Sequence, residues 1–277
     1  MSLNSINTNV GAMIALQSLN AINRDLSDTL RHISTGLAIS SPKDNPAIWA
    51  IAQNQRSESK SLDAVRASLQ RGQSITDVAL AAGETVTDLL GQMKQKMLAA
   101  SDTSLNTTSR KALNDDYLAL KRQIDRAVGG ADFNGVNLIS SGSTGQIRAL
   151  ANASASDSID VDHVDLSTTG SALSGMRADL LGAPVSAADL KAMSGAIENV
   201  TSALSHLGTG AYALQTHMTF IDKLQDTLEA SVGRLVDADM AKEATKLQAL
   251  QIKQQLAIKS LSIANSGPSY LLKLFGG

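Results

Sequence analysis

In residues 190–221 of this chain, every third or fourth residue is apolar, and steps of three and four alternate without a miss. Such a heptad repeat predicts a long helix with one edge that lies against another helix. For this segment we favour an intramolecular core over a surface that binds a partner. The repeat consists of Leu190, Met193, Ile197, Val200, Leu204, Leu207, Ala211, Leu214, Met218 and Ile221.

The composition excludes several classes of protein. The 277 residues include no cysteine, which rules out a disulfide scaffold, thiolate chemistry and a cysteine-based zinc site. The net charge is -2, and basic and acidic residues are interspersed, so we expect no binding to nucleic acid. No apolar run approaches the roughly 20 residues of a membrane span, and the first residues do not resemble a cleaved secretory signal. We therefore expect no membrane partner, and any export must use another route.

The chain begins with a second apolar repeat, which averages 3.5 residues per step and predicts a helix up to Gly36. Its apolar residues are Leu16, Leu19, Ile22, Leu26, Leu30, Ile33 and Leu37. Pro46 suits the first turn of a second helix, which the polar residues 101–109 end. Thr108 or Ser109 is the expected cap of a third helix that stops at Gly129 and Gly130.

Residues 131–185 are rich in Gly, Ser, Thr and Asp, and two runs at 146–150 and 158–166 alternate like strands. Ser186 and Asp189 form a start signal for the helix of the heptad repeat. A last helix, closed by Gly267 and Pro268, carries Leu247, Leu250, Leu256 and Leu261. The expected fold class is therefore mainly α, with long antiparallel coiled-coil helices from both chain ends and a small β-hairpin region in the middle.

The two terminal segments need neighbours. Burying about eight apolar side chains of the first helix contributes at most roughly 12 to 24 kcal/mol. Ordering its backbone costs about 1 to 2 kcal/mol per residue, so the segment is expected to be floppy alone. Ile14, Ala15 and Ala21 spread beyond a narrow seam, which indicates contacts on several sides. We expect termini that order only on assembly.

No pattern in the chain predicts catalysis or a cofactor. Asp160, Asp162, His163 and Asp165 are close together but lack the glycine and the distal Glu of a calcium loop. Asp237 and Asp239 are interpreted as partners of helix termini and not as a metal pair. The chain is therefore expected to be neither an enzyme nor a metal-binding protein.

Five motifs, in order and at matching spacing, give a resemblance that covers about residues 1–140 and 186–277. They are Ser5-Ile6-Asn7-Thr8-Asn9, Leu30-Arg31-His32-Ile33-Ser34-Thr35-Gly36-Leu37, Lys43-Asp44-Asn45-Pro46-Ala47, Asp132-Phe133-Asn134-Gly135-Val136-Asn137-Leu138 and Gly233-Arg234-Leu235-Val236-Asp237-Ala238-Asp239. Together they resemble bacterial flagellin, and residues 48–53 and the short length are most similar to alphaproteobacterial flagellins. The structural motif positions are Asp44, Asn45, Phe133, Asn134, Gly135, Arg234, Asp237 and Asp239.

The resemblance implies a division of the chain. Residues 1–44 and 237–277 would line the inner tube of a filament, and residues 45–130 and 186–236 would form the surrounding helical layer. Residues 131–185 would be the short variable region. The polymerisation interface would use the apolar residues of the first and last helices named above.

The resemblance also implies partners and a location. These are further copies of the chain, related flagellins, an export chaperone at the C-terminal helix, and hook-associated and cap proteins. The chain would be exported unfolded by the flagellar type III apparatus into the extracellular filament. Ser and Thr residues of the loops 101–109, 141–144, 154–158 and 167–171 are candidates for O-linked sugars, with plain solvated loop as the alternative.

Two other functions stay open at this point. A hook-filament junction protein shares the terminal motifs but usually has a longer middle. A secreted coiled-coil translocator or adhesin also uses long helices but would lack the Phe-Asn-Gly and Asp-Ala-Asp motifs. Whether the chain is a major or minor subunit, and how many protofilaments it forms, is left open.

Overall fold

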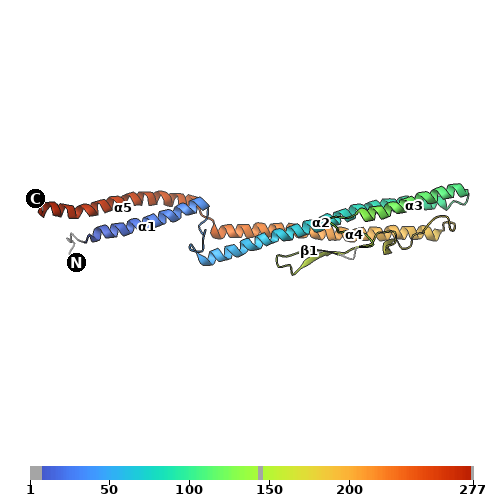
Figure 1. The fold of residues 1–277 in the computed structure, drawn as a ribbon, viewed down its shortest axis with the longest axis horizontal. Helices are drawn as coiled ribbons and strands as arrows, with labels where there is room; N and C mark the ends of the chain where they lie inside the picture. The colour runs from blue at the N-terminus through green and yellow to red at the C-terminus, as the bar shows by residue number, and fades with distance from the viewer. Residues whose placement is uncertain (1–7, 143–145, 276–277) are drawn as a thin grey trace. The chain divides into compact units, whose positions relative to one another are not determined.

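The computed structural model describes residues 8–142 and 146–275, and side chains only up to residue 266 of the last helix. The described chain divides into two compact units: residues 1–57 with 227–277, and residues 58–226. Figure 1 shows the helices and the small sheet. In chain order the elements are α1 (Val10–Thr35), α2 (Pro46–Ala100), α3 (Thr107–Gly130), β1 (Ile147–Leu150), β2 (Ser158–Val161), the short 3-10 helix η1 (Ser171–Leu173), α4 (Ala187–Val236) and α5 (Met240–Phe275). The expected fold class is confirmed.

Helix α1 has clear signals at both ends. The side chain of Asn9 accepts a hydrogen bond from the backbone N–H of Ala12 at 3.0 Å, which caps the first turn. Gly36 adopts φ +72° and donates its N–H to His32 at 2.8 Å. This left-handed C-cap explains why the helix stops where the sequence predicts.

Helices α1 and α5 pair in antiparallel fashion and lie side by side in Figure 1. Three polar contacts fix this pairing along its length. Asn9 donates to the carbonyl of Ala264 at 2.7 Å, and Gln254 donates to Asn23 at 2.7 Å. The Nδ1 atom of His32 lies 3.4 Å from a carboxylate oxygen of Glu243. As the residue number rises along α1, it falls along α5, as antiparallel pairing requires.

The chain between α1 and α2 is joined to the chain between α4 and α5. Leu37 and Asp237 form an isolated β-bridge. Ala38 donates its N–H to the carbonyl of Val236 at 2.7 Å, and Ala238 donates to Gly36 at 2.9 Å. A small core beneath this bridge contains Ala52, Val232 and Val236, with Leu37, Ile39, Ile48 and Leu235 packed against it.

In the second unit, the heptad repeat of α4 packs within the chain. Met193, Val200, Leu207, Leu214 and Ile221 are buried, which confirms an intramolecular core for this segment. Facing positions on α2 and α3 are also buried, among them Leu69, Leu90, Met93, Tyr117 and Ile124.

A polar network links α2 to α4 in this unit. Arg66 donates to Asp222 at 2.7 Å and also bonds to the side-chain oxygen of the buried Gln225. The amide nitrogen of Gln225 donates to the carbonyl of Ser59 at 2.9 Å and to Asp63 at 2.8 Å. Because every polar atom of Gln225 has a partner, the residue can be buried at low cost.

The two strands form an antiparallel sheet in which Ile147 pairs with Val161 and Leu150 with Ser158. Leu150 donates its N–H to the hydroxyl of Ser68 on α2 at 3.1 Å, so the hairpin lies on the helices. The second strand ends at Val161, whereas its alternating pattern predicts a strand up to Leu166. Beyond Val161 the chain bonds to another loop instead, where Val164 donates to Leu138 and Leu166 to Ile139, both at 2.9 Å.

Two other boundaries differ from expectation. The cap of α3 is Asn106, whose side chain accepts from Ser109 at 2.7 Å, and neither Thr108 nor Ser109 acts as the cap. Asn is a better N-cap than Thr and its position sets the helix start. The last helix continues through Gly267 and Pro268 to Phe275. Glycine is tolerated inside helices, and a proline there removes one hydrogen bond without forcing an end.

The start of α4 is as predicted. Asp189 accepts hydrogen bonds from the N–H and the hydroxyl of Ser186, both at 2.8 Å, and Ser186 accepts from the N–H of Asp189 at 3.2 Å. This reciprocal capping box satisfies the first turn. Arg177 also donates to Asp189 at 2.9 Å, and to the carbonyl of Ala183 at 2.9 Å, which folds the preceding loop against the helix start.

Candidate functional site

The side chains that could bind a metal are dispersed over the described residues. Nowhere in residues 8–142 and 146–275 do three or more His, Asp or Glu side chains come together so as to hold a metal ion. Asp160 accepts from Gln146 and Ser158 at 2.8 Å, and His163 contacts the carbonyl of Ser140 at 2.8 Å. These residues therefore serve the local structure of the hairpin and its loop.

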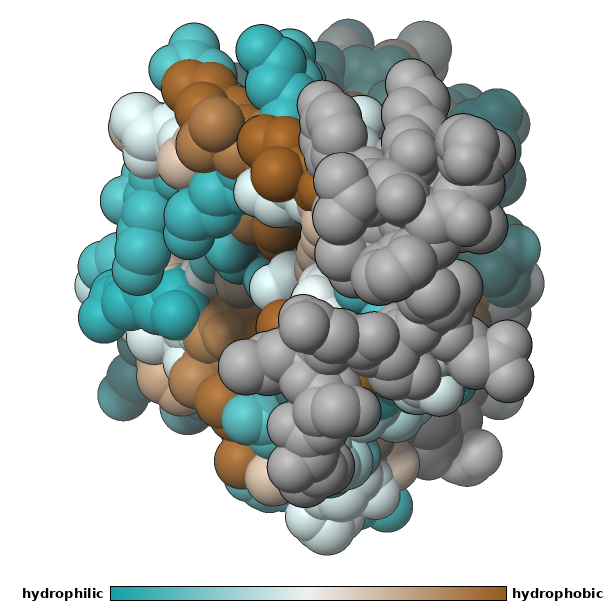
Figure 2. Space-filling view, turned by 90° about the vertical axis from the view of Figure 1, so that its left-hand side faces the viewer, coloured by the Kyte–Doolittle hydropathy of each residue, from teal (hydrophilic) through white to brown (hydrophobic). Residues whose placement is uncertain are grey.

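The feature that stands out is apolar surface on the terminal helices. On α1 the exposed aliphatic side chains are Val10, Met13, Ile14, Leu16 and Leu30, and Ile14 is 61% exposed. A groove on this helix is lined by Thr8, Val10, Met13, Ile14, Leu16, Gln17, Asn20 and Arg24, of which only Arg24 is charged. Figure 2 is a view from the left-hand side of Figure 1, and it shows hydrophobic residues open to solvent between hydrophilic ones.

Helix α5 exposes apolar side chains on more than one side. Leu250 is buried, while Leu247 and Leu261 are half-buried. The exposed residues are Met240, Ile252, Leu256, Ile258 and Ile263, and Ile263 is 71% exposed. Since one neighbouring helix can cover only one stripe, α5 keeps apolar surface for further neighbours.

The residues predicted to form a polymerisation interface fall into two groups. Leu16, Leu30 and Leu256 are exposed. The others lie partly or fully in the pairing of α1, α5 and the bridge region: Leu19, Ile22, Leu26, Ile33, Leu37, Leu247, Leu250 and Leu261. The heptad criterion therefore selected many residues that face the chain's own second helix. It did not select Val10, Met13, Ile252, Ile258 and Ile263, whose side chains are exposed.

The structural motif residues near the bridge hold the chain's turns. Asn45 caps α2 by accepting from the N–H of Ile48 at 3.2 Å, and Asp239 caps α5 by accepting from Lys242 at 3.1 Å. Asp237 takes part in the backbone bridge, and Arg234 is exposed. Each of these positions satisfies backbone groups that helix termini leave open, except for Arg234.

Asp44 is the centre of a charged and hydroxyl-rich contact. One of its oxygens accepts from the N–H groups of Ser40 and Ser41, both at 2.9 Å, and the other accepts from Arg31 at 2.7 Å. Desolvation alone would raise the pKa of Asp44, but hydrogen bonds from Ser41 and Ser40 and the charge of Arg31 together lower it. The carboxylate therefore stays ionised and ties α1 to the turn before α2.

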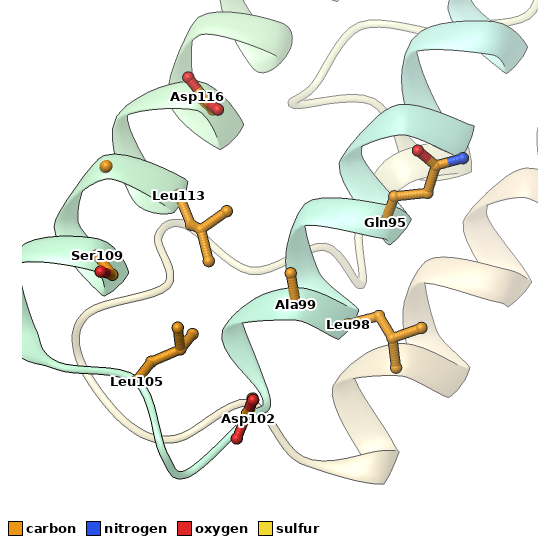
Figure 3. Close-up of a pocket in the computed structure, with 9 residues that line it drawn as sticks. Gln95, Leu98, Ala99, Asp102, Leu105, Ser109, Leu113 and Asp116 are labelled. Atoms are coloured by element: carbon orange, nitrogen blue, oxygen red, sulfur yellow. The ribbon is translucent and has the colours of Figure 1, made fainter.

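A second apolar groove lies where α2 ends and α3 begins, within the second unit. Figure 3 shows Leu98 and Ala99 on α2, Leu105 in the turn that follows, and Leu113 on α3. Asp102 and Asp116 lie at its polar margin. Asp102 accepts from the N–H of Ser104 at 2.8 Å, a hydrogen bond that lowers its pKa and shapes the turn. Asp116 accepts from Lys96 of α2 at 2.6 Å, so both carboxylates of this groove already have partners within the chain.

None of the described helices, taken over residues 8–142 and 146–275, combines the length and the hydrophobicity needed to cross a membrane. Long antiparallel helices with exposed aliphatic residues define a protein of the coiled-coil class.

Comparisons with known proteins agree with this class and narrow it. Residues 6–144 match the bacterial flagellin N-terminal helical region, and residues 190–275 match the bacterial flagellin C-terminal helical region. Flagellin FljK of Caulobacter vibrioides is 51% identical, with 99% of this chain and 100% of the relative covered. A flagellin of Brucella melitensis is 35% identical, with 99% of each chain covered. A solved structure of a putative flagellar hook-associated protein from Vibrio parahaemolyticus has a TM-score of 0.59, with 14% identity, 70% of this chain and 100% of that chain covered. This last likeness concerns the fold alone.

The chain belongs to the bacterial flagellin family, and it is similar to the short flagellins of alphaproteobacteria. It is a structural subunit of the bacterial flagellar filament and not an enzyme. Membership implies that the chain polymerises with itself and with related flagellins, and that its place is the extracellular filament. The resemblance seen in the sequence motifs is confirmed. The first three residues of the motif at 5–9 lie outside the described residues.

Proposed function

We propose that α1 and α5 form the surface through which copies of this chain stack into the filament. The observation that carries the proposal is the distribution of exposed large apolar side chains. Ten of them lie on α1 and α5, and six lie elsewhere in the described chain: Ile51, Leu98, Phe133, Leu181, Tyr212 and Phe220. A monomer gains nothing from this exposure, whereas a polymer buries it.

The same surface accounts for the open growth of a fibre. The exposed aliphatic residues of α1 and α5 lie outside the surface on which the two helices pack against each other. A second copy of the chain must therefore contact other faces of these helices. Contacts between unlike faces are heterologous, and they produce open helical assemblies when the rotation between copies does not close a ring. Burial of each exposed aliphatic side chain contributes about 1.5 to 3 kcal/mol at most.

The proposed division of the filament follows from these surfaces. Residues 1–44 and 237–277 form the inner tube, because their exposed apolar residues need neighbours on several sides. Residues 45–130 and 186–236 form the surrounding layer, which is supported by their buried heptad core. Residues 131–185, with the small hairpin, form the variable region.

The remaining partners are part of the same proposal. A chaperone covers α5 before assembly, supported by the exposed Ile252, Leu256, Ile258 and Ile263. Hook-associated and cap proteins contact the chain at the ends of the filament, and export proceeds unfolded through the type III apparatus. The family matches favour this reading over a hook-filament junction protein, a translocator or an adhesin. O-linked sugars on exposed loop Ser and Thr residues stay a prediction, which an intact mass of the filament protein tests.

A matched pair of variants on α5 tests the interface. Leu256 is 58% exposed, and its neighbour Gln255 is exposed and polar. Leu256→Ser should raise the critical concentration for polymerisation about tenfold or more, because it removes a buried contact from the polymer. Gln255→Ser imposes a similar loss of helix propensity and should leave the critical concentration near that of the wild type. Equal critical concentrations for the two variants in a sedimentation assay would refute the proposed surface.

Hydrogen exchange tests the expectation that the ends order on assembly. Amides of residues 10–35 and 240–266 should exchange fast in the dilute monomer and slowly in the filament. Amides of the buried core in α2 and α4 should be protected in both states. Full protection of α1 and α5 in a monomer that fails to polymerise would contradict the proposal.

A further inference from the structure

The tight turn at Phe133-Asn134-Gly135-Val136 has an unusual backbone. Asn134 has φ +55° and Gly135 has φ +81°, so both central residues are left-handed, as in a type I′ turn. Phe133 and Val136 exchange two backbone hydrogen bonds, at 3.0 and 3.1 Å. The side chain of Asp132 accepts a hydrogen bond from the N–H of Gly135 at 3.0 Å.

This turn holds the chain's single Asn that is followed by Gly. In such a pair the backbone nitrogen of the glycine can attack the side-chain carbonyl carbon of the asparagine, because glycine has no side chain to hinder the approach. The nitrogen loses its proton, a new C–N bond closes a five-membered succinimide, and the side-chain amide leaves as ammonia. Water then opens the ring to give aspartate or isoaspartate, so the net change is water in and ammonia out.

We propose that Asn134-Gly135 is a deamidation site of this protein and that Asp132 protects it in the folded state. The nucleophile of the reaction is the nitrogen of Gly135, and its proton is held by the carboxylate of Asp132. A hydrogen bond to a charged acceptor stabilises the protonated N–H and opposes the loss that the reaction requires. The two backbone bonds of the turn also resist the rotation needed for ring closure.

Reaction at this site changes the turn itself. Aspartate at position 134 places a second negative charge beside Asp132, and Asn134, Gly135 and Asp132 are all exposed to water. Isoaspartate moves the main chain through the side-chain carbon and adds one atom between positions 134 and 135. The bonds between Phe133 and Val136 then lose their register. A filament protein that passes through an unfolded form is thus most reactive before the turn closes.

The test follows conversion at position 134 by peptide mapping of the full-length monomer at mildly alkaline pH. Conversion should be at least about tenfold faster in denaturant than in the folded protein, since local structure must open before ring closure. Asp132→Ala should speed conversion of the folded protein roughly tenfold, the factor that corresponds to a hydrogen bond to a charged group. Asp132→Asn keeps an oxygen acceptor, so its conversion rate in the folded state should lie between those of the wild type and Asp132→Ala.

Two controls make the result specific. Asp157→Ala removes another loop carboxylate that accepts a backbone N–H, from Ser158 at 2.9 Å, and should leave the rate unchanged. Asn134→Asp has no side-chain amide at this position and should release no ammonia from it. The proposal is overturned if the folded and the denatured wild type react equally fast, or if folded Asp132→Ala reacts no faster than the folded wild type.

Discussion

Gly83 of α2 lies directly against Leu204 of α4, so close that a Cβ atom on Gly83 would overlap the Cδ2 atom of Leu204. Gly91, two turns further along the same helix, has nothing within 4 Å of the corresponding position. Gly91→Ala should stabilise the monomer by about 0.5 to 1 kcal/mol through helix propensity. Gly83→Ala gains the same helix propensity but forces Leu204 to move. Its free energy of unfolding should therefore be about 1 to 3 kcal/mol lower than that of Gly91→Ala. Urea unfolding of both variants measures the difference, and equal midpoints would contradict this packing.

The hairpin offers a second comparison between glycines. A Cβ on Gly210 of α4 would lie 3.0 Å from both methyl groups of Val161 on β2, whereas Gly208 has nothing within 4 Å. Gly210→Ala should push the strand away from the helix and weaken protection of its amides from hydrogen exchange. Gly208→Ala should leave strand protection as in the wild type, and loss of protection in both variants would argue against a direct contact.

Acid should weaken the start of α4. The N–H and hydroxyl of Ser186, and then Arg177, lower the pKa of Asp189 to about 2, from 3.8 without these partners. Because the pKa is lower in the folded state, the contribution to stability is complete above about pH 4 and is lost as the pH falls towards 2. Asp189→Asn should therefore lower the melting temperature at pH 7 and converge on the wild type near pH 2. A constant difference between the two proteins over this range would exclude the linkage.

Alkali should act through Tyr117. Its ring is fully buried and its hydroxyl donates to the carbonyl of Arg177 at 2.9 Å. Desolvation raises the pKa of Tyr117 to about 12, from 10.0 in water. The folded state therefore resists ionisation, and its stability should fall as the pH rises from 10 to 12. Ultraviolet titration should show a late tyrosinate signal that is absent in Tyr117→Phe and retained in Tyr212→Phe, since Tyr212 is exposed.

Much of this architecture is encoded locally. The alternation of steps between Leu190 and Ile221 predicts a packed helix because heptad spacing places its apolar residues on one face. Gly36 and the pair of Ser186 and Asp189 mark helix ends because their backbone or side chains satisfy terminal groups. Pro46 marks a helix start because it has no N–H that would lack a partner in the first turn, and α2 begins there. Signals that act within one turn are readable from the sequence.

What the sequence does not reveal depends on contacts between distant segments. Leu166 belongs to a strand-like pattern, but its N–H donates to the carbonyl of Ile139, a loop residue that comes well before it in the sequence. Leu250 and Leu256 have the same chemistry and both fit the apolar repeat, yet one is 5% and the other 58% exposed. The position of the neighbouring helix decides which of the two leucines is buried, and the periodicity of the sequence does not reveal that position.

The three polar contacts between α1 and α5 have a mechanical consequence. Asn9, Asn23 and His32 meet their partners at separate points along the pair. A slip of one helical turn would break all three contacts at once and would leave the part-buried side chains of Asn9 and His32 without these partners. Helices α1 and α5 therefore pair in a single register. In the filament proposed above, this single alignment gives every subunit the same pattern of exposed apolar side chains.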